Sequence, residues 1–247
     1  MTTREATRPL ALSDRSNGID SRTPSDRLFT FLWGAVQWPW LLRSLSPGRP
    51  QDRQALLASL QLPADALPVL GSWKADAGFL RMVASHVARY QPETVVEFGC
   101  GASTLVLARA LELAGGGVLI SHDQHLHFVE ATRAWLEYHG LGADIRHAPL
   151  LAPPPPWRGA WYGTAGLPTR IDLLLIDGPH WGVHPFARGA AETLFPRLAI
   201  GGTVLLDDGA RPGERVVLAR WRRRWPDMRF ALIHAGPKGT VVGERLR

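Results

Sequence analysis

Apolar residues recur along this chain in two alternating patterns, one typical of helices and one of buried strands. Between residues 75 and 90 they stand three and four positions apart, whereas residues 171–177 form a short, nearly continuous apolar run. The patterns predict helices over 52–60, 75–90, 103–113, 125–139, 185–198 and 214–225, and strands over 94–98, 118–121, 144–147, 171–177, 203–207, 229–234 and 240–243. Strands that alternate with helices pair in parallel through right-handed crossovers.

The last two predicted strands depart from this rule. Only residues 235–239 separate them, which is too few for a crossover, so these two strands must pair antiparallel. The sequence therefore predicts an α/β fold with a Rossmann-like, mostly parallel sheet, an antiparallel last strand, and helices on both faces.

The first 69 residues stand outside this alternation. Residues 1–27 are polar, mixed in charge and aperiodic, which predicts a disordered tail. Residues 28–69 are expected to form a Trp-rich, helical N-terminal extension, and residues 70–247 the main domain.

The uncharged run 28–42 holds three tryptophans. It is shorter than the roughly 20 apolar residues of a membrane span, Pro39 interrupts it, and no small-residue cleavage site follows it. Two interpretations stay open. The segment packs on the domain or on a second subunit of a homo-oligomer, or it lies peripherally in a membrane interface with Arg27 and Arg43 at the headgroups.

Composition narrows the function only a little. The net charge is +6, but nearly all the basic residues are arginine and the excess gathers after Arg211. Because no aromatic-plus-basic groove pattern accompanies this excess, the sequence argues against nucleic acid as the partner. Cys100 is the single cysteine, which excludes an internal disulfide and suits a reducing, cytoplasmic location.

The most specific motif lies at residues 95–104. A β-branched strand runs through Glu97 into Gly99 and Gly101 and then straight into a helix, a turn that lets backbone approach a nucleotide-like ligand. A dinucleotide fingerprint needs a third glycine where Thr104 stands, and the Glu97 carboxylate would disfavour a pyrophosphate. The same acid favours a ligand with an ammonium group and no phosphate, such as S-adenosylmethionine. A strand–helix connection without a ligand is the alternative.

Three further acids follow strands. Asp123 comes just past the second strand, where a carboxylate can accept hydrogen bonds from both ribose hydroxyls, although NAD sites use an acid there too. Asp177 and Asp208 end two strongly apolar strands, and if these are neighbours the two acids lie about 5 Å apart. Such a pair suits Mg²⁺ or another divalent cation that lowers the pKa of substrate hydroxyls. Asp207 should point away from Asp208, because side chains alternate along a strand. Capping of the following loops is the alternative role for both acids.

His180, three residues beyond Asp177, is the first candidate for a general base, since a neutral imidazole can accept the proton of a substrate hydroxyl. His184 is the second candidate. Methyl transfer from a sulfonium has a good leaving group, so positioning alone is a further possibility. Four aromatic residues near these histidines predict either an apolar substrate pocket or packing without substrate contact: Trp157, Trp161, Tyr162 and Trp181.

From about residue 70 onwards, the ordered motifs resemble the class I S-adenosylmethionine-dependent methyltransferases, and among them the bacterial small-molecule O-methyltransferase group. The matching segments are 97–103, Asp123, 176–180, 201–208 and 238–243. The resemblance implies a seven-stranded sheet with a reversed last strand. It also implies that the first motif, Glu97, Gly99 and Gly101 with Ser103 at its end, binds the methionine part of the cofactor, and that Asp123 binds the ribose.

The same resemblance exposes one departure. In metal-dependent relatives an Asn follows the second acid, whereas this chain has Gly209, which removes a ligand of the expected metal. The sequence thus predicts a transferase that O-methylates a small hydroxylated metabolite, with Asp177 and His180 at the reaction and Asp177 and Asp208 as the metal ligands. RNA or protein methylation, and a non-catalytic binding module of the same fold, are the alternatives.

Overall fold

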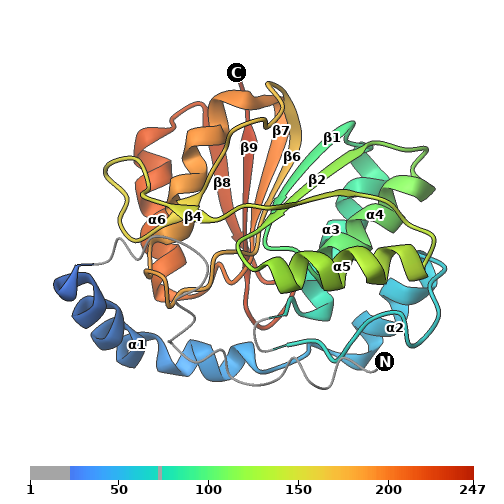
Figure 1. Cartoon of the computed structure of the whole chain (residues 1–247), viewed down its shortest axis with the longest axis horizontal. Coiled ribbons are helices and arrows are strands. Elements are labelled where there is room, and N and C mark those ends of the chain that lie inside the picture. Colours follow the sequence, from blue (N-terminus) through green and yellow to red (C-terminus); the bar gives the residue numbers. More distant parts are fainter. Residues whose placement is uncertain (1–22, 72–73) are drawn as a thin grey trace.

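A computed structural model describes residues 23–71 and 74–247. Its centre is a seven-stranded sheet of order β3-β2-β1-β6-β7-β9-β8 (Figure 1). The strands of this sheet are β1 (Thr94–Phe98), β2 (Val118–Asp123), β3 (Asp144–His147), β6 (Ile171–Ile176), β7 (Leu198–Leu206), β8 (Met228–Ile233) and β9 (Thr240–Arg245). A short antiparallel pair, β4 (Leu150–Leu151) with β5 (Trp161–Tyr162), lies outside it.

Strand directions confirm the predicted fold class. The pairs from β3 to β7 are parallel, whereas β9 is antiparallel to both β7 and β8. Most strand boundaries differ from the prediction by one or two residues, and the largest difference is at β7, which begins at Leu198 and not at 203. Its first residue pairs with Ile171 across a register shift, and the glycines at 201 and 202 interrupt the apolar pattern there.

Six α-helices and a long 3₁₀ helix are found in the described residues. They are α1 (Pro24–Ser44), α2 (Pro50–Ser59), α3 (Ala77–Tyr90), α4 (Ala102–Leu113), α5 (Leu126–Tyr138), the 3₁₀ helix η2 (Ala187–Arg197) and α6 (Pro212–Arg224). The segment predicted as one helix over 185–198 is thus the tighter 3₁₀ form. Gly189 and Pro196 lie within it, and both residue types disfavour an α-helix.

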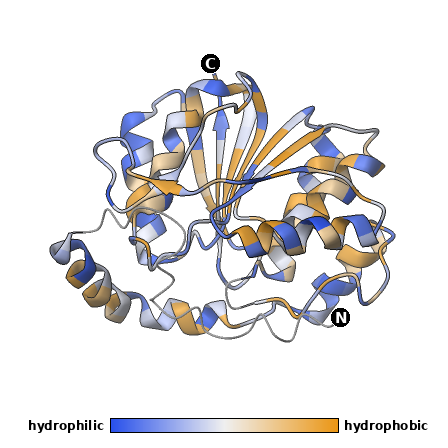
Figure 2. Ribbon diagram, in the orientation of Figure 1, coloured by the Kyte–Doolittle hydropathy of each residue, from blue (hydrophilic) through white to orange (hydrophobic). Residues whose placement is uncertain are grey.

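The sheet is covered on both faces. Helices α3, α4 and α5 pack on one face, where Val95 of β1 points; Val96 and Phe98 point to the other, beneath η2, α6 and the β4–β5 pair. Figure 2 shows the apolar strands that this arrangement buries. Trp221 of α6 is fully buried, and Trp225, directly after the helix, packs on Phe195.

Helix α1 corrects the predicted end of the N-terminal tail. The helix begins at Pro24, because the hydroxyl of Thr23 accepts from the backbone N–H of Asp26 and the Asp26 carboxylate accepts in return. Residues 23–27 therefore belong to the helix and its cap, while residues 1–22 of the predicted tail lie outside the described residues. Helix α1 runs along the edge of the sheet at which β6 and β7 end (Figure 1). None of the described helices is both long and apolar enough to cross a membrane.

Candidate active site

The glycine turn after β1 has the geometry of a ligand cradle. Gly99 and Gly101 both have positive φ, +97° and +154°. A Cβ on Gly99 would lie 2.6 Å from the backbone nitrogen of Gly178, so only glycine fits against the loop after β6. A Cβ on Gly101 would meet no atom within 4 Å. The turn is therefore packed on one side and open on the other, with the N-terminus of α4 next to the open side.

Glu97 is fully buried behind this turn. Its Oε2 accepts hydrogen bonds of 2.6 Å from the hydroxyls of Thr104 and Ser121, and the nearby hydroxyl of Ser103 also favours the ionised form. Its Oε1 has no partner. Burial raises the pKa of Glu97 to about 7, against the opposing effect of the three hydroxyls. Ser103, predicted to bind the cofactor, thus lies beside Glu97, whose Oε1 still has acceptor capacity.

Asp123 joins the ends of β1 and β2. Its two oxygens accept from the backbone nitrogens of Cys100 (3.1 Å) and His125 (2.7 Å), and burial raises its pKa to about 7. The carboxylate therefore fixes the glycine turn against the loop after β2. Each oxygen has a second lone pair that can still accept from a ligand hydroxyl.

Tyr162 and Gln124 are site residues that the sequence did not reveal in this role. The hydroxyl of Tyr162 donates to Oε1 of Gln124 at 2.5 Å, and the ring stacks on Phe98. This hydroxyl also lies so close to Gly178 that a Cβ there would be 2.2 Å from it. Tyr162 thus spans the carboxyl edge of the sheet between β2 and β6. The position of Gln124 directly after Asp123 is the one signal in the sequence that points to it.

The predicted acids meet at the ends of β6 and β7. Ile176 pairs with Leu206 in the sheet, and Asp177, Asp207 and Asp208 each place a carboxylate oxygen within 4.8 Å of the others. The expectation that Asp207 points away from Asp208 is wrong. Asp208 has left-handed backbone, φ +60°, so the strand alternation stops before it.

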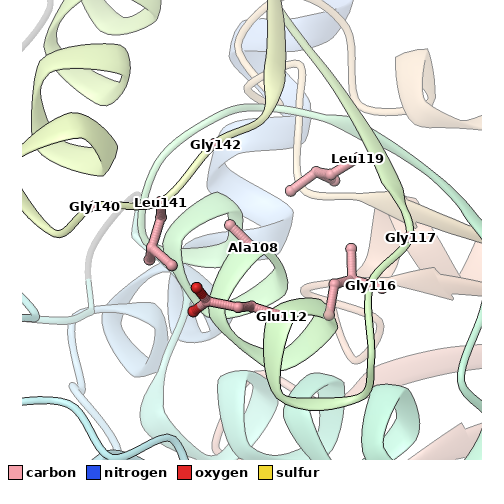
Figure 3. A pocket seen from close by; sticks show the side chains of 9 residues that line it. Ala108, Glu112, Gly116, Gly117, Leu119, Gly140, Leu141 and Gly142 are labelled. Atoms are coloured by element: carbon pink, nitrogen blue, oxygen red, sulfur yellow. The ribbon is translucent and has the colours of Figure 1, made fainter.

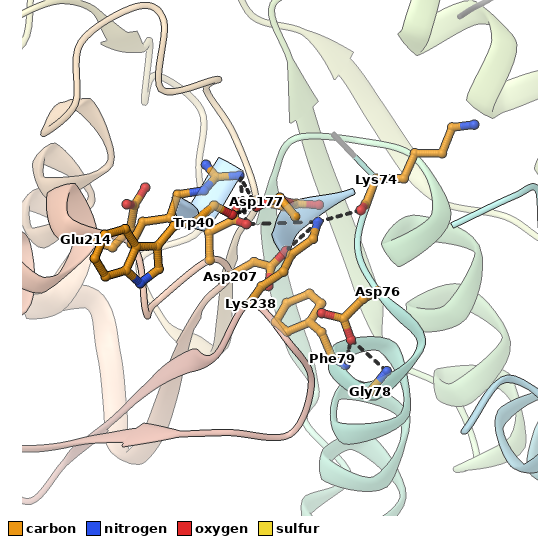
Figure 4. Close-up of polar contacts among 12 residues, drawn as sticks. Trp40, Lys74, Asp76, Gly78, Phe79, Asp177, Asp207, Glu214 and Lys238 are labelled. Carbon is orange, nitrogen blue, oxygen red and sulfur yellow. Dashed lines mark hydrogen bonds and ion pairs between the residues drawn. The ribbon is translucent and has the colours of Figure 1, made fainter. Parts of the chain in front are cut away.

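Three buried cations lie among these acids. Arg188 of η2 places Nη1 3.1 Å from Asp208, and Arg211 places Nη2 2.8 Å from the other oxygen of that carboxylate. Lys238 lies 3.9 Å from both Asp207 and Asp208 and donates to the carbonyl of Lys74 (Figure 4). Sequence patterns did not single out these cations. The one signal in the sequence was an arginine, Arg188, within a predicted helix that packs on the sheet.

The cations give the acids different protonation states. Burial opposes ionisation of Asp208, but Arg211, Lys238 and Arg188 outweigh it and lower its pKa to about 2. Burial and the neighbouring Asp208 charge raise the pKa of Asp207 well above its ordinary value. The pKa of Asp177 is raised as well, chiefly by burial, but its side chain is 13% exposed whereas Asp207 is not exposed at all. Asp177 is therefore the member of the cluster that a ligand can reach.

This donor set does not fit a divalent cation. Two guanidinium groups and an ammonium already compensate the carboxylates, and a metal would add two positive charges beside them. A side chain at position 209 is also excluded, because a Cβ on Gly209 would lie 2.6 Å from the backbone nitrogen of Val241. The missing Asn thus has a structural reason, and no step below passes through a metal.

The two candidate histidines differ in accessibility. His180 is exposed on the loop after β6, and its Nδ1 accepts from the backbone of Gly182, which places the ring proton on Nε2. In this arrangement the ring presents a donor rather than a base. His184 is buried between Phe29 and Phe186, and its Nδ1 accepts from the backbone of Phe186. His184 therefore serves packing.

Most of the four aromatic residues predicted near the histidines belong to the core. Trp157 is buried and donates to Glu192, and Trp161 is buried against Phe98. Trp181 is half-buried and faces Gly34 of α1. Trp157 and Trp161 therefore pack in the core, which was the second of the two roles considered for them, and do not line a substrate pocket.

Helix α1 covers the loop that carries the histidines. Phe29 stacks on His184, Trp33 contacts Phe186, and the hydroxyl of Ser44 accepts from Arg211. A separate hollow lies at the C-terminal end of α4, lined by Ala108, Glu112, Gly116 and Leu141 among others (Figure 3). That hollow is remote from the glycine turn at the opposite end of α4, so the two are different places.

Comparisons with known proteins agree with this fold. Residues 96–209 match the family model described as "Methyltransferase domain". A methyltransferase from Geobacter sulfurreducens is 18% identical with a TM-score of 0.54, over 93% of this chain and 100% of its own. An O-methyltransferase from Bacillus cereus, solved in complex with S-adenosylhomocysteine (SAH), is 14% identical with a TM-score of 0.52, over 88% and 100%.

A putative O-methyltransferase from Klebsiella pneumoniae has the same fold, with 18% identity and a TM-score of 0.52 over 89% of this chain and 100% of its own. No curated protein matches the chain in sequence. The fold and the matched domain define the class: the chain has the architecture of a class I S-adenosylmethionine-dependent methyltransferase. The resemblance found in the sequence is thereby confirmed.

Proposed function

We propose that this protein transfers the methyl group of S-adenosylmethionine to a hydroxyl of a small metabolite. The observation that carries the proposal is the unpartnered Oε1 of the fully buried Glu97, directly behind a glycine turn that is open at Gly101. A buried carboxylate oxygen without a partner is costly unless a ligand satisfies it. The ammonium of the cofactor is such a ligand.

The residues around the turn suit the rest of the cofactor. The backbone at Gly99 and Gly101 lets the methionine part approach the N-terminus of α4, and Asp123 has acceptor capacity for the ribose hydroxyls. When bound, the cofactor supplies an electrophilic methyl group on a sulfonium sulfur. Tyr162 and Gln124, joined by a hydrogen bond, lie beside the same turn, next to Gly178 and Asp123.

Asp177 is the group that we assign to the substrate hydroxyl. Its carboxylate is accessible, its pKa is raised chiefly by burial, and it lies beside the glycine turn. It accepts the hydroxyl proton as the oxygen takes the methyl group. His180, whose Nδ1 is engaged by Gly182, donates from Nε2 and orients the substrate. Arg188 bonds the Asp177 carbonyl and holds this residue in place.

Calorimetric titration of the whole chain with SAH tests the cofactor assignment. We expect binding, with at least about tenfold weaker affinity for Glu97→Gln, since a charge-assisted hydrogen bond is lost. The control is Glu112→Gln, at an exposed acid of α4 paired with Arg109. If SAH does not bind at millimolar concentration, the proposal is wrong.

Methyl transfer to a panel of catechols and other small phenols tests the substrate class. We expect turnover that is the same with Mg²⁺ and with EDTA, because protein cations already neutralise the acid cluster. Turnover that EDTA abolishes and Mg²⁺ restores would contradict this. SAH binding without turnover of any hydroxyl compound would instead favour the RNA or protein substrates, or the binding module, that the sequence left open.

A further inference from the structure

Helix α1 is inverted relative to a normal surface helix. Asp26, Thr30, Gln37 and Ser44 are buried toward the protein. The opposite side is exposed and apolar, with side chains between 50% and 78% exposed: Leu28, Phe31, Leu32, Val36, Trp38 and Leu42. A soluble helix normally turns its apolar stripe inward and its polar residues outward. The orange residues of α1 in Figure 2 lie on a helix that is separated from the core of the sheet.

The buried side is polar because it faces the candidate active site. Ser44 accepts from Arg211 of the acid cluster, and Asp26 pairs with Arg158 at 3.4 Å. Both atoms of the Gln37 amide, on the same side of the helix, are buried without a partner. These contacts set which side of α1 points inward, so the outer apolar side is a consequence of how the helix docks. A contiguous exposed apolar surface made by six side chains of one helix marks an interaction site.

The charges around this outer side select its partner. Arg27 and Arg43 are exposed at the two ends of the stripe. The sequence between them contains no charged residue, and the next acid along the chain is Asp52. Within the described residues, this side of α1 is therefore apolar in the middle and has an exposed arginine at each end, while Asp26 beside Arg27 is buried.

A second copy of this chain is a poor match to that pattern. A two-fold axis across α1 pairs the helices antiparallel. Arg27 of one copy would then lie beside Arg43 of the other, so that two like charges would meet at each end of the helix pair. An anionic lipid surface complements both arginines at once and accepts the apolar stripe below the headgroups.

We propose that α1 binds in the interface of an anionic lipid bilayer, parallel to its surface. Phe31 and Trp38, 78% and 60% exposed, enter the boundary between headgroups and acyl chains, and Arg27 and Arg43 contact lipid phosphates. The buried side of α1 keeps its contacts with Arg211 and His184. The candidate active site therefore lies directly beneath the membrane-bound helix.

Co-sedimentation of the full chain with vesicles tests this proposal. We expect binding to mixed phosphatidylglycerol–phosphatidylcholine vesicles, weak binding to phosphatidylcholine alone, and loss of binding at high salt. The double variant Phe31→Ser/Trp38→Ser should bind at least about tenfold more weakly, because two aromatic side chains no longer leave water. The matched control is Val118→Ser/Ile200→Ser, which removes two apolar side chains, 54% and 74% exposed, at the starts of β2 and β7.

A charge variant keeps the test decisive if the aromatic variant does not fold. Arg27→Gln/Arg43→Gln should lower binding to the anionic vesicles about fivefold for each arginine. Circular dichroism checks that all variants are folded. The proposal is overturned if the folded wild-type chain stays in the supernatant with anionic vesicles. It is also overturned if the control and the α1 variants bind vesicles equally. A third contradicting result is a dimer, seen by light scattering, that the Phe31→Ser/Trp38→Ser variant does not form and that vesicles do not dissociate.

Discussion

Asp177 and Asp208 are the same residue type at equivalent strand ends, yet their surroundings give them different roles. Asp208 is ionised between Arg188 and Arg211, whereas Asp177 is partly accessible and has a raised pKa. We predict that Asp177→Asn lowers turnover about 100-fold or more at nearly unchanged stability, because the proton acceptor is lost. Asp208→Asn should instead destabilise the fold by about 3–5 kcal/mol, since it leaves buried guanidinium groups uncompensated.

Kinetics of methyl transfer and urea denaturation, measured on both variants, separate these two effects. Full turnover in Asp177→Asn would exclude it as the base. A stable Asp208→Asn would show that Arg188 and Arg211 do not depend on this carboxylate.

Glu97 couples cofactor binding to pH. Its pKa is raised to about 7 by burial, and an ammonium group binds the ionised form. We therefore predict that SAH affinity is highest above pH 7 and falls as the pH drops through 7. Below pH 7 the free protein carries a proton on Glu97, which SAH binding releases. Calorimetry across this range in two buffers of different ionisation enthalpy measures both effects. In Glu97→Gln the affinity should be low at every pH, and a slope identical to that of the wild type would assign the titration to another group.

At the scale of elements, the junction of β7 and β9 is too close for a side chain. Gly209 donates to the carbonyl of Gly239, and a Cβ at position 209 would lie 2.6 Å from the backbone nitrogen of Val241. We predict that Gly209→Ala destabilises the protein by about 2 kcal/mol, as backbone must shift to relieve the overlap. Gly142→Ala is the control, because a Cβ there meets nothing within 4 Å. Equal urea midpoints for the two variants would contradict the prediction.

Elements also show where sequence patterns succeed. The glycine turn with the helix that follows it, and the hairpin of β8 and β9, were predicted because their signals are local: glycine spacing, apolar periodicity and a short connection. Helix η2 and the docking of α1 were not predicted in their observed form. The 3₁₀ geometry of η2 and the inward polar side of α1 depend on contacts with distant residues, such as Trp157 above Gly189 and Arg211 beside Ser44.

For the whole molecule, buried carboxyl groups and buried histidines have opposite effects on the free energy of unfolding as the pH falls. Burial raises the pKa of Glu97 and Asp123 to about 7, so their contribution to stability is full below their unfolded pKa and is lost as pH rises through 7. Burial lowers the pKa of His122 and His184 to about 4. The stability that these two histidines contribute is therefore fully present above pH 6.5 and is lost as the pH falls through 4. We predict that the two sets change the free energy of unfolding with opposite sign between these limits.

Urea denaturation at several pH values checks this balance. Glu97→Gln removes one carboxyl from the first set, so this variant should lose stability relative to the wild type as the pH falls from 7 to 4.5. His122→Asn should show the opposite trend. The prediction would be contradicted if the two variants changed in the same direction relative to the wild type over this interval.

Local sequence patterns were enough to predict the α/β class, the reversed last strand, the glycine turn and the acids at the strand ends. Each of these follows from residues close together in the chain, where periodicity and backbone freedom act directly. The folded chain was needed to find that Arg188, Arg211 and Lys238 compensate those acids, that Ser103 lies beside Glu97, and that α1 exposes its apolar side. Charge compensation and burial are sums over neighbours that folding brings together from distant positions, so no local pattern contains them.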